Sequence, residues 1–194
     1  MDHDVTKHGL RKSSKAALSA MSEDDRRTHS ARICALIEQL DEYKQASTIL
    51  VYAALGTEVD LDGLMVSALE SGKRVCVPRV DWDAGTMVPT AIMNLDTDLV
   101  VGRYGVRSPG GNCERIPVSG LEMVVVPGLA FDCDGGRLGR GKGFYDRLLV
   151  GGALCPLVGV CFSCQVVGRV PMEAHDRVMD RVVCEQGVLR RDNG

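Results

Sequence analysis

Residues 124–147 read VVVPGLAFDCDGGRLGRGKGFYDR, and this stretch decides both the expected fold and the expected site. The apolar run at 124–126 has the composition of a buried strand, and it breaks at Pro127-Gly128. In open α/β folds, ligands bind beyond the carboxyl ends of the strands. The loop that follows this strand is therefore expected to lie at the edge of a sheet and to face a ligand.

The loop is rich in glycine and in positive charge. Glycines leave the backbone free to turn its N–H groups inward, and cations supply charge-assisted donors to phosphate oxygens. Composition alone leaves two interpretations open, a phosphate-binding loop and a solvated surface turn. The glycines are Gly135, Gly136, Gly139, Gly141 and Gly143, and the cations are Arg137, Arg140 and Lys142.

Two common nucleotide-binding motifs are incomplete in this loop. Gly136-x-x-x-x-Gly141-Lys142 has the spacing of a P-loop, but Gly143 stands where a Ser or Thr would hold magnesium. Gly139-x-Gly141-x-Gly143 lacks the spacing of the dinucleotide fingerprint. A P-loop nucleotidase is therefore disfavoured.

Residues 143–149 are typical of the first turns of a helix, with Asp146 in the opening turn. A carboxylate there is stabilised by the helix N-terminus, and it is also a suitable ligand for a magnesium ion that bridges phosphates. The sequence leaves both roles open.

The order of these residues resembles the 5-formyltetrahydrofolate cyclo-ligases, also called methenyltetrahydrofolate synthetases. The match covers PGLAFD at 127–132 and GRLGRGKGFYDR at 136–147, which is far more specific than a single glycine pattern. With further matches outside this stretch, the resemblance spans nearly the whole chain. The remaining matches are Lys7-x-x-x-Arg11, Glu58-Val59-Asp60, GRYGV at 102–106, Gln165, Pro171, His175, Asp176 and Asp180.

The resemblance implies an ATP-dependent ligase that converts 5-formyltetrahydrofolate to 5,10-methenyltetrahydrofolate, ADP and phosphate in folate one-carbon metabolism. It implies phosphorylation of the formyl oxygen, followed by attack of the neighbouring nitrogen to close the ring through a C–N bond. Such chemistry needs positioning and charge neutralisation more than a protein nucleophile. The sequence agrees, because it has no convincing Ser-His-Asp or Cys-His set.

The resemblance also implies roles for individual residues. Arg140 and Lys142 are the implied catalytic cations, and Asp146 and Asp176 are the implied ligands of a Mg²⁺ cofactor. Substrate contacts are implied at Ala53, Glu58, Tyr104 and Tyr145. ATP contacts are implied at Lys7, Arg11, Gly136, Arg137, Leu138, Gly139, Arg140, Gly141, Lys142, Gly143, Phe144 and Tyr145.

Several of these residues also have ordinary structural interpretations. The cations around Lys7 are typical of a solvated helix face, and Asp176 of a solvated loop acid. Glu58 is placed to cap a helix that begins near Leu61, and Tyr104 to pack in a core.

Ser108 departs from the family pattern, since many bacterial relatives carry an acid before the following proline. This departure keeps a second function open, a non-catalytic nucleotide- or folate-binding relative of the family. Formation of the methenyl product distinguishes the two functions.

Hydrophobic periodicity predicts alternating helices and strands. This alternation predicts one α/β domain over 1–194, with a three-layer α/β/α Rossmann-like fold and a mostly parallel sheet. Helices are expected near 5–20, 23–41 and 61–69, strands at 49–52, 75–78, 87–92, 123–126 and 157–162, and loops at 79–86 and 107–120.

Bulk properties narrow the classes of partner. A formal net charge of −3 argues against a general nucleic-acid binder, which needs a broad basic surface. The sequence has neither an apolar run of ~18 residues nor a secretory signal, so no membrane association is expected and the cytoplasm is the expected compartment. We expect a monomer whose partners are small molecules.

The chain has eight cysteines, which a cytosolic thiol pool would keep reduced. Most are expected to be small buried hydrophobes. Cys161-Phe162-Ser163-Cys164 has the spacing of a metal or redox pair, but no second such pair exists. A strand followed by a turn is the favoured interpretation of that segment.

Overall fold

The structure, a computed structural model, describes residues 6–150, 155–173 and 176–189. Its centre is a seven-stranded sheet in the order β11-β10-β9-β6-β1-β2-β3. The strands from β10 to β2 are parallel, and β3 and β11 run antiparallel at the two edges. The strands are β1 (Thr48–Leu50), β2 (Arg74–Asp81), β3 (Thr86–Ile92), β6 (Met123–Pro127), β9 (Leu157–Val160), β10 (Arg181–Cys184) and β11 (Gly187–Leu189).

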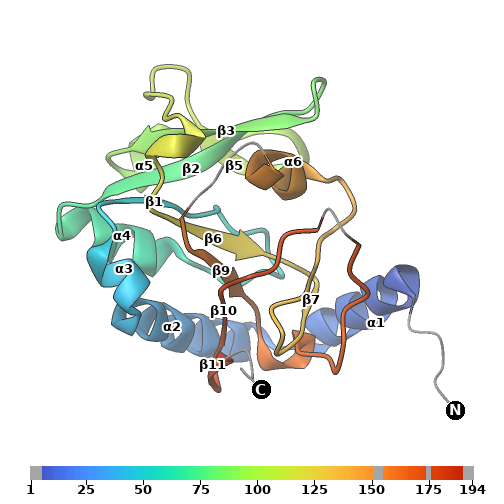
Figure 1. Ribbon diagram of the computed structural model, residues 1–194. Helices are drawn as coiled ribbons and strands as arrows, with labels where there is room; N and C mark the ends of the chain where they lie inside the picture. The colour runs from blue at the N-terminus through green and yellow to red at the C-terminus, as the bar shows by residue number, and fades with distance from the viewer. Residues whose placement is uncertain (1–5, 151–154, 174–175, 190–194) are drawn as a thin grey trace, which may run out of the picture.

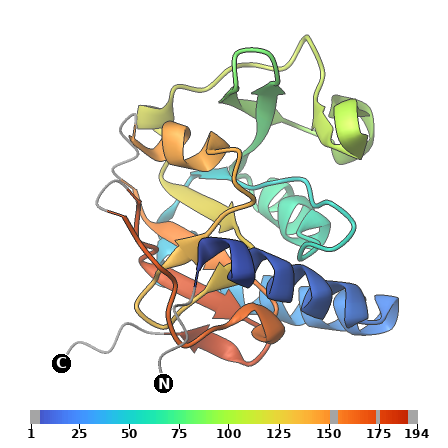
Figure 2. The same ribbon diagram turned by 90° about the vertical axis from the view of Figure 1, so that its right-hand side faces the viewer.

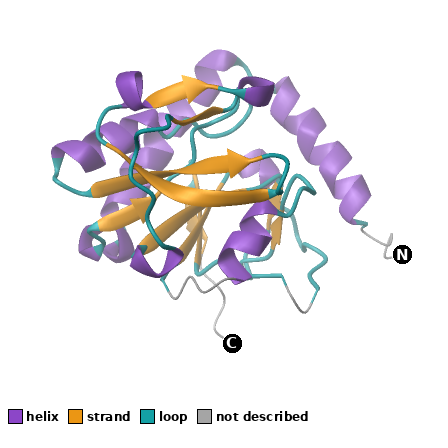
Figure 3. Cartoon of the chain, turned by 90° about the horizontal axis from the view of Figure 1, so that it is seen from above, coloured by secondary structure: helices purple, strands orange, loops and turns teal. Residues whose placement is uncertain are grey.

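Helices cover both faces of the sheet, as Figures 1 and 3 show. On one face, α2 (Glu23–Gln39) and α4 (Asp62–Glu70) pack their apolar residues against the sheet together with Leu18 of α1 (Lys7–Ala20). On the other face, α6 (Phe144–Val150) contributes Leu148 and Leu149, and irregular segments complete the layer. The α/β/α fold with a mostly parallel sheet is therefore confirmed, although its second helical layer is thin. That all 194 residues form one domain stays a prediction.

The run at 124–126 forms the middle of β6, which lies between β1 and β9. All three valines are 0% exposed because both faces of the sheet are covered. This explains why the strand is continuously apolar instead of alternating.

The expected loop at 79–86 is wrong at both ends. The β2 strand continues to Asp81, β3 begins at Thr86, and Val80 lies opposite Met87 in an antiparallel hairpin. Figures 1 and 2 show this hairpin on the far side of the molecule from α1 and α2. The end of β2 was not predicted, because Val80 is the only apolar residue among residues 79–81.

Several short elements were not predicted, because two to five residues are too few to show a period. One of them, β5, lies in the loop expected at 107–120, and β7 and β8 form a small hairpin inside the glycine-rich loop. They are the sheet strands β10 and β11, α3 (Asp41–Gln45), α5 (Leu95–Asp98), β4 (Leu99–Val101), β5 (Arg107–Pro109), β7 (Ala130–Phe131), β8 (Arg137–Leu138), and the 3₁₀ turns η1 (Arg103–Gly105), η2 (Val118–Gly120) and η3 (Ser163–Gln165).

All eight cysteines lie in the described residues, and all are free thiols. Burial raises the pKa of the Cys34 thiol to about 11 and that of Cys76 to about 12, as expected of inert buried groups. Cys161 directly follows β9 and Cys164 lies in the 3₁₀ turn at 163–165, so the predicted strand followed by a turn is confirmed. In the described part of the chain, we find no helix with the length and apolar character needed to span a bilayer.

The order of the strands predicts where a ligand-binding crevice lies. From β1 the chain moves to β2 and β3 on one side, and it later adds β6, β9 and β10 on the other. The order in which strands are added to the sheet therefore reverses between β1 and β6. In open α/β folds the crevice at such a switch point, outside the carboxyl ends of the strands, receives the ligand.

Candidate active site

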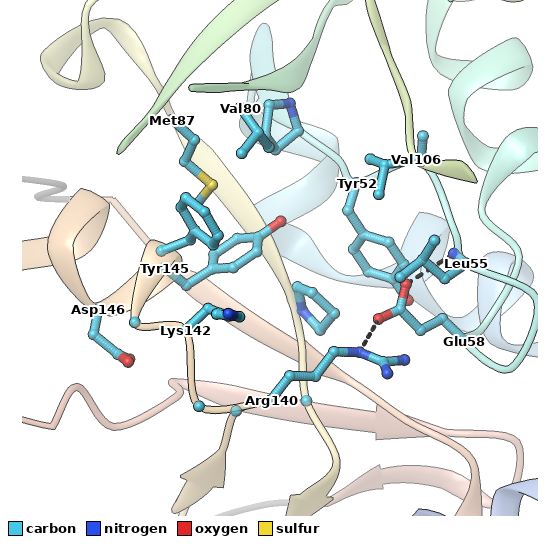
Figure 4. A pocket seen from close by; sticks show the side chains of 18 of the residues that line it. Tyr52, Leu55, Glu58, Val80, Met87, Val106, Arg140, Lys142, Tyr145 and Asp146 are labelled. Carbon is cyan, nitrogen blue, oxygen red and sulfur yellow. Dashed lines mark hydrogen bonds and ion pairs between the residues drawn. The ribbon is translucent and has the colours of Figure 1, made fainter. Parts of the chain in front are cut away.

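A cavity of about 210 Å³ opens at the predicted position, beyond the carboxyl ends of β1 and β6 (Figure 4). Its first wall is the segment after β1, with Tyr52, Leu55 and Glu58. The β2–β3 hairpin and the glycine-rich loop supply the other walls. The predicted placement of the loop at this end of β6 is therefore confirmed.

The first half of the glycine-rich loop closes a hairpin, and of its residues 135–138 only Arg137 lines the cavity. The buried carboxylate of Asp132 accepts the N–H groups of Gly136 at 2.7 Å and Asp134 at 3.1 Å, and its other oxygen accepts that of Val170 at 2.7 Å. Leu138 is 2% exposed, in a small apolar cluster. Gly136 and Leu138 are thus outside the cavity lining, and their contact with ATP stays a prediction.

Arg137 lines the cavity but is largely buried, with its side chain 6% exposed. It donates to the carbonyl of Pro127 at 3.1 Å and forms an ion pair with Asp146. This guanidinium therefore ties the end of β6 to the first turn of α6.

Gln165, from the family motif, fixes the same strand end from the other side. Its amide donates to the carbonyls of Gly128 at 2.9 Å and Leu129 at 3.2 Å. Gln165 is 3% exposed, so its role here is to hold the backbone that lines the cavity.

The second half of the loop brings its cations to the cavity. Arg140 donates from Nε to Glu58 at 2.9 Å, and the other Glu58 oxygen accepts the N–H of Leu55 at 2.9 Å (Figure 4). Lys142 also lines the cavity, and within the described residues its ammonium has no hydrogen-bond or ion-pair partner. The site thus offers one oriented guanidinium and one uncommitted ammonium.

The first helix approaches the loop from outside. Arg11 donates from Nε to the carbonyl of Gly139 at 3.1 Å. Lys7 binds Glu173 at 2.7 Å and Asp176 at 2.9 Å. The hydrogen bond with Glu173 is the largest cause that raises the pKa of Lys7, and partial burial opposes it. The structure therefore brings Arg11 to the glycine-rich loop, whereas Lys7 pairs with carboxylates of the segment that contains Glu173 and Asp176.

The two predicted metal ligands lie in different surroundings. Asp146 lines the cavity, is 37% exposed, and binds Arg137 through one oxygen. Asp176 accepts from Lys7 and from the N–H of Glu173, and it is not part of the lining. Across the ranges described, no three His, Cys, Asp or Glu side chains form a metal-binding group. One carboxylate at a cavity still suits Mg²⁺, which takes most of its ligands from phosphates and water.

Tyr145 presents an unsatisfied polar group. Its hydroxyl is buried and has no partner among the residues described, and burial raises its pKa far above the usual value. Tyr52, by contrast, donates to the carbonyl of Val59 at 3.1 Å. A buried hydroxyl without a partner costs about 1–3 kcal/mol, so a ligand that bonds to Tyr145 recovers this energy. Ala53 is buried at the same wall.

Tyr104 lies outside the cavity lining and is 73% exposed, so its interpretation as a core residue is wrong. Its ring meets Trp82 edge-on at 5.0 Å, and Trp82 in turn meets Phe144 at 5.5 Å. Trp82 lines the cavity but was not predicted as a site residue, because it falls in an expected loop. The signal that was available is that Trp82 is the only tryptophan in the chain.

A cavity at the switch point of the sheet, lined by cations and aromatic side chains, is typical of an α/β enzyme. Residues 3–185 match the sequence profile of the 5-formyltetrahydrofolate cyclo-ligase family. The chain belongs to the 5-formyltetrahydrofolate cyclo-ligase family, as its sequence predicted.

Two relatives illustrate the match. The mouse 5-formyltetrahydrofolate cyclo-ligase is 27% identical over 189 residues, which cover 92% of this chain and 93% of the relative. The enzyme of the same name from Escherichia coli K12 is 32% identical over 144 residues, covering 71% and 78% respectively.

Two solved structures are similar to this chain. The 5,10-methenyltetrahydrofolate synthetase of Aquifex aeolicus superposes with a TM-score of 0.85 at 33% identity, covering 98% of this chain and 95% of that protein. The synthetase from Mycoplasma pneumoniae, at 21% identity, has a TM-score of 0.75 over 93% and 99%, which shows the shared fold.

Proposed function

We propose that this protein converts 5-formyltetrahydrofolate and ATP to 5,10-methenyltetrahydrofolate, ADP and phosphate. The observation that carries the proposal is the placement of Arg140 and Lys142 in one cavity with the unpartnered hydroxyl of Tyr145. Membership of the cyclo-ligase family supports the same reaction. The names of the relatives, all ligases or synthetases, favour it over a non-catalytic binding protein.

In this reaction the γ-phosphoryl group leaves ADP and forms a P–O bond to the formyl oxygen. The neighbouring nitrogen then attacks the formyl carbon and loses its proton, and the C–O bond breaks to release phosphate. Lys142 neutralises charge on the transferred group, and Arg140, oriented by Glu58, binds the same phosphates. Arg140 needs no change of position during transfer, because its ion pair with Glu58 holds it beforehand.

The substrate side of the site is the region around Glu58. One Glu58 oxygen accepts from Arg140, and a carboxylate has further lone pairs for the amino-pyrimidine edge of the pterin. Ala53 and Tyr145 lie at the same cavity, and Tyr104 lies at its rim through Trp82. We assign all four residues to the binding of the folate.

The direct test is the absorbance of the methenyl product. We expect it to appear when the purified protein is mixed with 5-formyltetrahydrofolate, ATP and magnesium, and to depend on each of them. ADP should form in equal amount. Binding of either ligand without any product would instead support the non-catalytic relative.

Mg²⁺ is proposed as the cofactor, held by Asp146, with Asp176 as a second ligand. The ion supplies neutralisation of phosphate charge. The donor set at the cavity fits, since one oxygen of Asp146 binds Arg137 and the other is available. Lys7 and Arg11 would contact the nucleotide from the side of α1. Monomeric state and cytoplasmic location stay predictions.

Asp146→Asn is expected to raise severalfold the magnesium concentration needed for half-maximal activity, because an amide oxygen binds a hard cation more weakly than a carboxylate. Asp176→Asn should have a smaller effect. A magnesium titration of the initial rate measures both. The unfolding temperature serves as the control, since Asp146 also pairs with buried Arg137. If Asp146→Asn lowers only this temperature and keeps normal magnesium dependence, Asp146 is an ion-pair partner and not a metal ligand.

A further inference from the structure

Arg147 is an exposed residue of α6 that joins two walls of the cavity. Its guanidinium donates to the carbonyl of Gly85, in the turn of the β2–β3 hairpin, from Nε at 2.8 Å and from Nη2 at 2.5 Å. Nη2 also donates to the carbonyl of Lys142 at 2.9 Å. One side chain therefore holds the hairpin turn and the glycine-rich loop at the same time.

The guanidinium occupies a fitted slot between two glycines. Gly85 and Gly143 both have left-handed backbones, with φ of +66° and +68°. A Cβ at position 143 would lie 2.8 Å from Nη1, and one at position 85 would lie 3.4 Å from Nη2. A side chain at position 143 would therefore collide with the guanidinium, whereas a Cβ at position 85 would only touch it. The bare backbone of Gly143 is what lets Arg147 fit.

A second contact joins the same two walls. Trp82, at the start of the hairpin turn, meets the ring of Phe144 edge-on at 5.5 Å, and the Arg147 guanidinium carbon lies 5.4 Å from the centre of that ring. Trp82, Val80 and Met87 form the hairpin's part of the cavity wall. Any movement of the hairpin away from α6 therefore changes the surroundings of Trp82.

We propose that Arg147 is a positioning residue that holds the turn at Lys142-Gly143 against the β2–β3 hairpin. The inference rests on the proposed function, because the residue it positions is the cation assigned to the transferred phosphoryl group. Fixing the carbonyl of Lys142 fixes the backbone from which its ammonium reaches the cavity. The two hydrogen bonds to the carbonyl of Gly85 hold the hairpin wall beside the same loop, so the phosphate side and the folate side are held as one unit.

Lysine cannot replace arginine in this role. The planar guanidinium directs several N–H groups at two carbonyls that belong to different segments, whereas an ammonium is a single point charge. Arg147→Lys and Arg147→Ala are therefore expected to lower kcat by roughly 10-fold, because small errors of placement are costly in a positioned reaction. KM for both substrates should change less than kcat. Free guanidinium ions should restore part of the activity of Arg147→Ala.

Fluorescence tests the contact without catalysis. Trp82 is the only tryptophan, so acrylamide quenching of the ligand-free protein reports this wall alone. We expect faster quenching in both Arg147 variants. The control is Arg181→Lys, which should leave the quenching unchanged; Arg181 lies on β10, and its guanidinium pairs with Glu42 of α3 at 3.1 Å.

Unchanged quenching in both Arg147 variants would overturn the proposal, whether or not the protein is active. Loss of activity that tracks a lower unfolding temperature and resists guanidinium would also overturn it. If the unsubstituted protein forms no product, the proposed function fails and quenching alone decides the role of Arg147.

Discussion

Lys142→Ala is expected to lower kcat by roughly 100-fold or more, the effect typical of removing one preorganised charge from a transition state. The described residues give the Lys142 ammonium no partner, so its charge is free to act on the ligand. The loss should therefore appear in kcat more than in KM for ATP. Arg140→Ala should have an effect of similar size, because it removes a phosphate donor and also leaves Glu58 without its partner.

Initial rates of product formation at varied ATP concentration measure both parameters. Lys142→Arg should be impaired as well, because a planar fork does not reproduce a point charge. Lys44→Ala is the matched control, since Lys44 is an exposed lysine paired with Asp41 on α3. Near-normal kinetics in both Lys142→Ala and Arg140→Ala would exclude these residues from the phosphate site.

Gly135→Ala is expected to destabilise the protein by about 2–5 kcal/mol, the sum of a left-handed backbone cost and an overpacking cost. Gly135 has φ of +84°, and a Cβ there would lie 2.3 Å from the carbonyl oxygen of Met179. That oxygen belongs to the backbone, so no side-chain rotation relieves the collision. Since a domain is stable by only about 5–15 kcal/mol, this variant should lose a large share of its stability.

Gly72→Ala separates the two costs. Gly72 has φ of +81°, and a Cβ there would meet no atom within 4 Å. Only the backbone cost of about 1–2 kcal/mol then applies. Urea unfolding followed by circular dichroism measures both variants. Equal destabilisation of the two would contradict the close approach of the segment at 176–180 to the glycine-rich loop.

The long elements were predictable because each repeats a pattern over many residues. The apolar residues of α2 and α4 recur at helical spacing, and β6 is a continuous apolar run. Each pattern involves several residues, so the prediction does not depend on any single one. The edge strand β11 and the hairpin of β7 and β8 were missed, since two or three residues carry no period. Their pairing is decided by partners that lie elsewhere in the chain.

The glycine-rich loop shows the same limit within the site. Its composition correctly predicted a loop with unusual backbone freedom and placed it at the end of β6. Composition did not distinguish Gly135, which gives room for the Met179 carbonyl, from Gly139 and Gly141, which line the cavity. It also did not separate buried Arg137 from Arg140, because both are the same residue type in the same loop.

By itself, the sequence determined the fold class, the family, the position of the loop after β6 and the set of chemical groups available there. These depend on local burial patterns and on an ordered motif, both of which can be recognised along the chain. Only the tertiary structure decided that Glu58 meets Arg140 across 82 residues, that Trp82 lines the cavity, and that Arg147 binds the hairpin turn. Such contacts join distant segments, and the packing of the whole sheet and its helices determines which side chains they bring together.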